Sequence, residues 1–294
     1  MKTHLAGIIP IANIKTDHDN LLPEILLPID NGFSAIQKSV YECALAGCNT
    51  IWIVANDDMA PIVRKCVGDW VYDPVYYNRN FSKFHSERRK EIPIYYVPIH
   101  PKDRERRDSY GWSVINGIYN SWTVSNKLSK WLNPTKYYVS FPLGAFNLDI
   151  IRKSRNLIND KQNNFFLSLS GKTVKDDLLL SFTMFGEDFK LCRRHVNKTT
   201  TREFLPPLKE NEMPTEKLPF EERWSARYFQ LSDVFYPLQI QEKTVDVDWY
   251  YDLSIWQNYC EFLGSDKFIK KPIKELTKPH LHVKIPYIVE EGEE

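Results

Sequence analysis

The sequence predicts an α/β fold with a mostly parallel central sheet flanked by helices, followed by a C-terminal half built on a mixed sheet. The first observation is a pair of short apolar runs, residues 5–12 and 50–56, on either side of a helical pattern. A strand, a crossover helix and a second buried strand form the βαβ unit from which parallel sheets are built. The second observation is that strand-like and helical patterns alternate to about residue 158, after which two further strand-like runs follow.

The helix of this βαβ unit is expected over residues 34–46. Ser34 is a suitable N-cap, and Gly47 stands where a C-cap needs a residue with positive φ. Apolar side chains recur between them with the 3.6-residue period of a helix, at Ile36, Val40, Cys43 and Ala44. Because ligands of parallel sheets bind beyond the carboxyl ends of the strands, the loop 13–20 is the expected place of chemistry.

Composition limits the class of protein. An apolar content of 43% and an aromatic content of 14% are typical of a folded globular chain. The 39 basic and 38 acidic side chains nearly cancel, so the net charge gives no reason to expect nucleic acid or an anionic membrane as partner. Five dispersed cysteines without a C-x-x-C pair indicate reduced thiols, and no apolar run approaches a membrane span. We therefore expect a soluble, cytoplasmic protein.

The remaining elements follow from the same patterns. A third strand is expected over 92–99, where Pro93 and Pro98 restrict it to an edge or to its own ends. The other expected strands cover 136–141, 165–170, 178–185 and 280–285, and the other helices end at 67 or cover 109–122, 149–158 and 252–262. Residues 142–147 are read as a loop and 199–219 as an irregular connector. We expect one domain over 1–265, with halves 1–158 and 159–265, and a tail over 266–294.

A basic cluster lies between the third strand and the helix that follows it. It consists of Lys102, Arg104, Arg106 and Arg107, preceded by His100 at the strand end. Guanidinium groups match phosphate oxygens, and a helix N-terminus adds N–H donors, so the cluster and His100 are candidates for phosphate binding. The alternative is a solvated charged loop in which the same cations pair with Asp103, Glu105 and Asp108.

Four segments share a pattern with one enzyme family. They read L-A-G-I-I-P at 5–10, L-P-E-I-L-L-P-I at 22–29, a helix with its strand and turn at 35–57, and D-L-S-I-W-Q-N-Y at 252–259. Together they resemble the sugar-1-phosphate nucleotidyltransferases, which have a GT-A-like, Rossmann-type fold. The resemblance covers residues 1–265 and implies that 1–158 is a nucleotide-binding half. The segments 92–98 and 100–104 also resemble uncharacterised proteins of T4-like marine phages, which implies a bacteriophage origin and a place in the host cytoplasm or the virion.

In that family a sugar phosphate attacks the α-phosphate of a nucleoside triphosphate and pyrophosphate leaves. The resemblance implies a nucleotide or nucleotide-sugar ligand and a Mg²⁺ ion held by carboxylates. It makes Asp252 a metal ligand and catalytic residue, and Lys15 a second catalytic residue. Asp17 or Asp19 would supply a further carboxylate to the metal. Gly7 and Asn13, beside the first strand end, become candidate nucleotide contacts.

The sequence departs from the family at three places. The family's G-x-G-T-R loop is replaced by residues 11–20, which contain no glycine. Glu24 stands in place of the activating lysine, and residues 142–146 lack the carboxylate expected after the fourth strand. These departures concern nucleotidyl transfer and leave nucleotide binding open, so the sequence does not decide whether the chain is an enzyme.

Two other functions remain open. One is a catalytically inactive relative that acts as a phage-encoded structural or interaction protein, with the aromatic segment 70–77 facing a protein partner. The other is a GT-A glycosyltransferase in which Asp246 and Asp248 form a D-x-D motif, so that Asp248 is a metal ligand. On a strand, these two carboxylates would share one face and Val247 the other.

Overall fold

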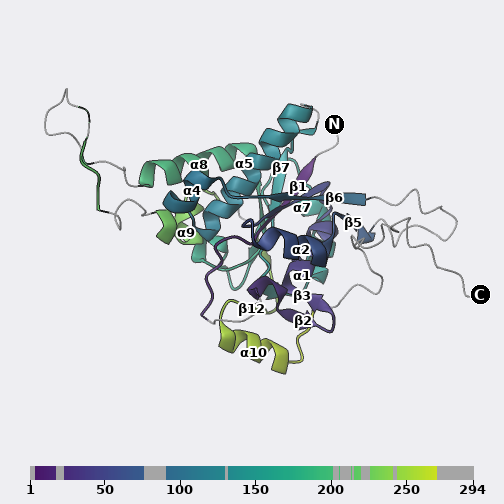
Figure 1. Cartoon of the computed structure of the whole chain (residues 1–294). Coiled ribbons are helices and arrows are strands. Elements are labelled where there is room, and N and C mark those ends of the chain that lie inside the picture. Colours follow the sequence, from purple (N-terminus) through teal and green to yellow (C-terminus); the bar gives the residue numbers. More distant parts are fainter. Residues whose placement is uncertain are drawn as a thin grey trace, which may run out of the picture.

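A six-stranded sheet forms the centre of the chain in a computed structural model (Figure 1). The model describes residues 4–17, 23–75, 91–129, 132–200, 205, 213, 215–219, 226–240 and 244–269. The sheet order is β10 (Phe182–Phe185), β7 (Lys136–Val139), β1 (Leu5–Pro10), β4 (Thr50–Val54), β6 (Glu91–Val97) and β5 (Trp70–Tyr72). The four inner strands are parallel and the two outer ones run antiparallel to them. The predicted fold class is therefore confirmed.

The βαβ unit at the start of the chain consists of β1, α1 (Ala35–Ala46) and β4. The Gln37 side chain accepts a hydrogen bond from the Ser34 N–H at 2.9 Å, which closes one half of a capping box at the start of α1. Gly47 ends the helix with φ 89°, a left-handed conformation that a side chain would strain. The expected apolar face is at most 1% exposed at each position, at Ile36, Val40, Cys43 and Ala44.

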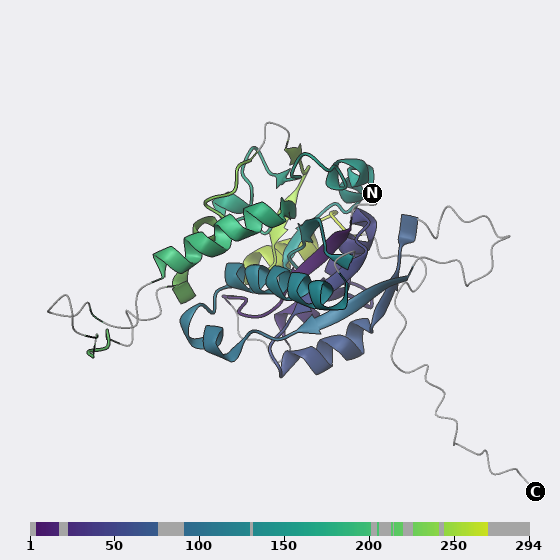
Figure 2. The same ribbon diagram turned by 90° about the horizontal axis from the view of Figure 1, so that it is seen from above.

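Helices cover both faces of the sheet. Figure 1 shows α1 and α2 (Met59–Val67) on one face and α5 (Tyr110–Leu128) on the other, and Figure 2 shows α8 (Gly186–Thr199) beside α5. At Gly117 a Cβ atom would lie 2.6 Å from Val54 and 2.9 Å from Ile8, so α5 packs directly on β1 and β4. None of the helices in the described part of the chain is long and apolar enough to cross a bilayer.

Short strand pairs and helical turns complete the described chain. β2 (Pro28–Asp30) pairs with β3 (Phe33–Ser34), β8 (Gly144–Phe146) with β12 (Tyr250–Asp252), and β9 (Leu167–Ser168) with β11 (Val245–Asp246). The remaining helical segments are η1 (Glu24–Leu26), α4 (Pro101–Arg106), α6 (Asp149–Lys153), α7 (Arg155–Ile158), η4 (Val174–Asp176), α9 (Leu231–Val234) and α10 (Trp256–Gly264).

Several expected elements differ in their bounds. The expected loop 142–147 contains the strand β8, which pairs with β12. The expected helix 252–262 begins only at Trp256, because Asp252 still belongs to β12. The helix expected over 149–158 is broken at Ser154. Pro98 lies just beyond the last residue of β6, as expected. Pro93 is instead the third residue of this inner strand and is paired with Trp70 of β5, so the restriction to an edge or to the strand ends is wrong for Pro93.

Other expectations meet the structure only in part. All five cysteines are free thiols, as expected. The aromatic segment 70–77 begins with the edge strand β5, where Trp70 is 41% exposed, but residues 76 and 77 lie outside the described residues. The edge strand expected over 280–285 and most of the connector 199–219 also lie outside them. The division of the domain near residue 158 remains a prediction.

Candidate ligand site

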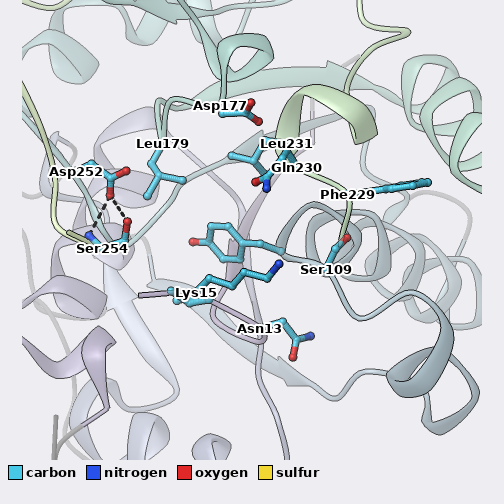
Figure 3. A pocket seen from close by; sticks show the side chains of 12 residues that line it. Asn13, Lys15, Ser109, Asp177, Leu179, Phe229, Gln230, Leu231, Asp252 and Ser254 are labelled. Carbon is cyan, nitrogen blue, oxygen red and sulfur yellow. Dashed lines mark hydrogen bonds between the residues drawn. The ribbon is translucent and has the colours of Figure 1, made fainter. Parts of the chain in front are cut away.

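A cavity of about 150 Å³ opens at the carboxyl edge of the sheet, beyond the end of β1. Figure 3 shows Asp252 and Ser254 at one end of it and Phe229 at the other. Five segments far apart in the sequence line the cavity: the loop after β1 (13–15), the start of α5 (109–110), the turn after η4 (Asp177 and Leu179), the segment before α9 (229–231) and the turn after β12 (Asp252 and Ser254). This is the edge at which parallel sheets bind ligands.

The loop after β1 is held against the start of α5. The Tyr110 hydroxyl donates to the Pro10 carbonyl at 3.3 Å, and the Ser113 hydroxyl donates to the Ala12 carbonyl at 3.0 Å. Asn13 has φ 59° and its side-chain amide donates to Asp108 Oδ1. Asparagine tolerates this left-handed conformation better than most side chains, so the loop turns here without a glycine.

Burial raises the pKa of two groups around this loop. It raises the pKa of the Asp108 carboxyl, although the hydrogen bond from Asn13 opposes the shift. It raises the pKa of the Tyr110 phenol well above its ordinary value, and the nearby carboxylate of Asp252 adds to that increase. Tyr110 therefore keeps its proton and acts as a hydrogen-bond donor at neutral pH.

The turn after β12 fixes Asp252. Its Oδ1 accepts hydrogen bonds from the Ser254 N–H at 2.9 Å and from the Ser254 hydroxyl at 2.6 Å (Figure 3). Asp17 joins this turn to the loop after β1, because its N–H donates to the Ser254 carbonyl at 3.2 Å and its Oδ1 accepts from the Trp256 N–H at 2.7 Å. The structure thus brings Asp17 close to the turn that contains Asp252, while Asp19 lies outside the described residues.

The donors that the structure describes at this edge do not fit a resident Mg²⁺ site. Among the described residues, Asp252 is the one predicted metal ligand that lines the cavity, and one of its oxygens is held by Ser254. The Asp17 carboxylate instead binds the first N–H of α10. No group of three or more His, Cys, Asp or Glu side chains in the described part of the chain is placed to hold a metal. We therefore assign no chemical step to a bound metal.

Asp246 and Asp248 lie apart from the cavity lining. Both are exposed and Val247 between them is buried, but of the two aspartates only Asp246 belongs to a strand, β11. The Ser168 hydroxyl donates to Asp246 Oδ1 across the β9–β11 pair. This hydrogen bond gives Asp246 a structural contact in that pair.

The basic cluster lies on the short helix α4 and on the residue that follows it, and it does not line the cavity. The His100 Nδ1 accepts from the Lys102 N–H at 3.2 Å and so caps this helix. Arg104 pairs with Asp57 at 2.6 Å, and Arg107 lies 3.7 Å from Asp103. The Arg106 side chain lies outside the described residues. In both ion pairs the arginine is paired with a carboxylate of the protein, as the alternative of a charged surface loop expects. Of the two carboxylates, only Asp103 was suggested as a partner by the sequence.

The other predicted contacts divide between the cavity and the core. Lys15 and Asn13 line the cavity, and the exposed ammonium of Lys15 lies 5.7 Å from the ring centre of Tyr228. Gly7 lies in the middle of β1, where a Cβ atom would come within 2.9 Å of Cys43 Sγ. The structure therefore gives Gly7 a packing role between β1 and α1.

Most of the cavity wall was not predicted from the sequence. Ser109 and Tyr110 enter through the N-terminus of α5, a position that the N-cap signal of Ser109 could have indicated. Asp177 and Leu179 follow a single helical turn, and residues 229–231 follow a segment without any periodic pattern. Only the tertiary fold brings these segments to the strand ends.

Comparisons with known proteins support the fold. No known family profile and no curated protein matches the chain. A solved structure of a putative glucose-1-phosphate thymidylyltransferase from Bacillus anthracis in complex with a sucrose is similar with a TM-score of 0.50, at 11% identity over 91% of this chain and 98% of that one. A UDP-glucose pyrophosphorylase complexed with UDP-glucose is similar with a TM-score of 0.51, at 11% identity over 89% and 97%.

These likenesses define a class of fold, the nucleotidyltransferase-like α/β fold with a mostly parallel central sheet. Both similar structures have names that place them among the sugar-1-phosphate nucleotidyltransferases. At 11% identity the likeness concerns the fold alone. What this chain binds must therefore be argued from its own residues.

Proposed function

We propose that the chain binds a nucleotide or nucleotide-sugar in the cavity at the carboxyl edge of its sheet. The observation on which this depends is the convergence of five separate segments on Asp252, the carboxylate that the family resemblance singles out. Binding sites of open α/β folds are formed in this way, by loops that extend from the strand ends. The nucleotidyltransferase-like fold supports the proposal.

The charges of the lining favour the uncharged part of such a ligand inside the cavity. Among the described lining residues, the charged side chains are one cation, Lys15, and two carboxylates, Asp177 and Asp252. A triphosphate would meet a net negative lining, whereas the hydroxyl groups of a sugar ring can donate to carboxylates. Apolar side chains on the same wall, Leu179 and Leu231, suit the C–H face of a ring. We place the phosphates outside, beside Lys15.

The cavity also has the size for a single ring. Its volume of about 150 Å³ is below the range of roughly 300–1,000 Å³ that encloses a drug-sized ligand. A complete nucleotide-sugar would therefore leave its nucleotide part outside the described lining.

Binding without nucleotidyl transfer is the form of this function that the donors favour. The glycine-free loop turns through Asn13, and Asp252 stands without the second carboxylate that the resemblance implies after the fourth strand. An inactive relative that acts by binding is consistent with both observations. The glycosyltransferase alternative would use Asp246 and Asp248, which lie outside the cavity lining, and we favour it less for that reason.

Calorimetric titration tests the proposal. Wild-type protein is titrated with UDP-glucose, UTP and glucose, each with and without Mg²⁺. We expect UDP-glucose to bind in both conditions, and Asp252→Asn to weaken that binding at least about tenfold, since a charge-assisted hydrogen bond is worth roughly 1.5–3 kcal/mol. Asp248→Asn is the matched control and should leave the affinity unchanged. An absence of binding by the whole panel, or equal losses in the two variants, would contradict the proposal.

A further inference from the structure

Lys38 and Glu42 form an ion pair in the interior, one turn apart on α1. Both side chains are wholly buried, and Lys38 Nζ lies 3.1 Å from Glu42 Oε2. The other carboxylate oxygen accepts from the Tyr138 hydroxyl at 2.7 Å and from the Ser181 hydroxyl. A buried charge pair is costly unless further hydrogen bonds satisfy it, and here Glu42 gains two.

The Lys38 ammonium also donates to the backbone between β7 and β8. Nζ donates to the Phe141 carbonyl at 2.9 Å and to the Gly144 carbonyl at 2.7 Å. We call residues 141–144 the β7–β8 corner. The carbonyls at both ends of this corner thus turn inward to the same cation. The ammonium also lies 5.2 Å from the ring centre of Phe146.

The other side of the β7–β8 corner supports the ligand cavity. Gly144 is the register partner of Asp252 in the β8–β12 pair, and the Leu253 N–H donates to the Leu143 carbonyl at 2.8 Å. A Cβ atom at Gly144 would lie 1.9 Å from the Leu179 carbonyl oxygen, so these backbones touch. The Phe141 ring lies 5.4 Å from that of Tyr110. Three cavity residues, Asp252, Leu179 and Tyr110, therefore rest on one corner.

We propose that Lys38 is a positioning residue of the ligand site. Its ammonium ties both ends of the β7–β8 corner together, and the corner sets the places of Asp252, Leu179 and Tyr110. Lys38 is wholly buried and is not among the residues that line the ligand cavity, so it acts through these residues. The family resemblance implies a carboxylate in residues 142–146. In this chain the Lys38 ammonium instead binds the backbone carbonyls of the β7–β8 corner. The inference rests on the proposed function of the cavity.

The test needs a variant that removes the ammonium without leaving a lone buried carboxylate. In Lys38→Met/Glu42→Gln the methionine replaces the aliphatic part of the lysine without its ammonium, and the glutamine amide oxygen can still accept from Tyr138 and Ser181. The matched control is Lys136→Met. Lys136 is also wholly buried and donates to three carbonyls, but these belong to Ile158, Asp160 and Asn163, away from the cavity.

Two readouts are measured below the melting temperature of each variant. We expect the Kd of UDP-glucose to rise at least about tenfold in the double variant and less than about twofold in Lys136→Met, a difference of about 1 kcal/mol. Independently of any ligand, we expect amide hydrogen exchange at Leu253 to quicken at least about tenfold. Exchange at Asn49, whose N–H donates to the Leu5 carbonyl at 2.7 Å, serves as the reference and should not change.

The outcomes separate the two proposals. Unchanged affinity and unchanged exchange at Leu253 in the double variant would overturn the positioning role. Equal losses in the double variant and in Lys136→Met would also overturn it, because a general loss of packing would then explain both. If wild-type protein binds no UDP-glucose, the proposed function fails for this ligand, and exchange at Leu253 alone decides whether Lys38 orders the corner.

Discussion

At the scale of single residues, Gly144 is the position where the site tolerates the least change. The Leu179 carbonyl oxygen lies where a Cβ atom of residue 144 would be, and the Gly144 carbonyl accepts a hydrogen bond from the Lys38 ammonium. Because the obstructing atom belongs to the backbone, it cannot move aside as the end of a flexible side chain can. The sequence predicts only a loop at Gly144, since a close approach of two distant backbones leaves no local pattern.

Gly144→Ala should therefore destabilise the protein strongly. Overpacking against a backbone atom costs at least about 3 kcal/mol when the strand must shift, and urea denaturation followed by circular dichroism measures the loss. Gly264→Ala is the matched control, because no atom lies within 4 Å of its Cβ position. That change should alter the free energy of unfolding by less than about 1 kcal/mol. Similar losses in the two variants would refute the close contact.

Some of the candidate site could be predicted residue by residue. Asn13 and Lys15 follow the first strand directly, and Asp252 stands in a recognisable motif, so all three were expected near one edge and all three line the cavity. Asp177 and Gln230 gave no such signal, because each reaches the cavity through a turn whose place depends on the whole fold. Lys38 was also missed. Its position on a helix is compatible with an exposed lysine, and only tertiary packing buries it.

At the scale of elements, the inner strands of the central sheet could be predicted, whereas the short two-stranded pairs could not. The apolar runs of β1 and β4 are buried on both faces and stand out in the sequence. Strands β8 and β12 have three residues each, too few to show a period. Helix α8 was missed because only three of its fourteen residues are buried, Phe189, Cys192 and Val196, among many charged ones.

Lys136, in β7, should make the free energy of unfolding of the protein depend on pH. Burial lowers the pKa of this lysine to about 8, against about 10.5 in an unfolded chain. Between these values the unfolded state binds more protons than the folded state, so the free energy of unfolding rises with pH. Above pH 10 the buried tyrosines, whose pKa values are raised, act in the opposite direction.

We therefore expect the stability of the wild type relative to Lys136→Met to increase by about 1–2 kcal/mol between pH 8 and pH 10. Urea unfolding of both proteins at closely spaced pH values measures it. Below pH 7 the difference between them should be constant, because the lysine is then protonated in both states. A difference that stays flat across pH 8–10, or that falls, would contradict a lowered pKa in the folded protein.

A second ionic contact joins the C-terminal end of α1 to α7. Arg155 pairs with Asp73, which is 1% exposed, and also donates to the Leu45 carbonyl at 3.1 Å. Arg155→Met should cost about 3 kcal/mol, because it removes a cation from a buried carboxylate. Adding Asp73→Asn should recover part of that loss in the same thermal or urea titration. If the double variant is less stable than the single one, the buried charge is not the cause.

At the scale of the whole molecule, the central parallel sheet is the feature that the sequence predicted best. Alternating strands and helices predict a mostly parallel sheet, and the structure has one, with an antiparallel strand at each edge. Two solved nucleotidyltransferases share this fold over about nine-tenths of the chain, at 11% identity. Packing patterns can persist at such low identity, whereas side chains that perform chemistry need not.

Amide NMR shifts test directly whether the cavity between Lys15 and Asp252 receives the ligand. Uniformly ¹⁵N-labelled protein is titrated with UDP-glucose and its amide resonances are followed. We expect shifts together in the five segments that meet at the cavity, with Lys15, Tyr110 and Ser254 among the largest. Shifts confined to the second described cavity, beside Lys161 and Lys190 at the start of α8, or a spectrum without any change, would contradict the assignment of this site.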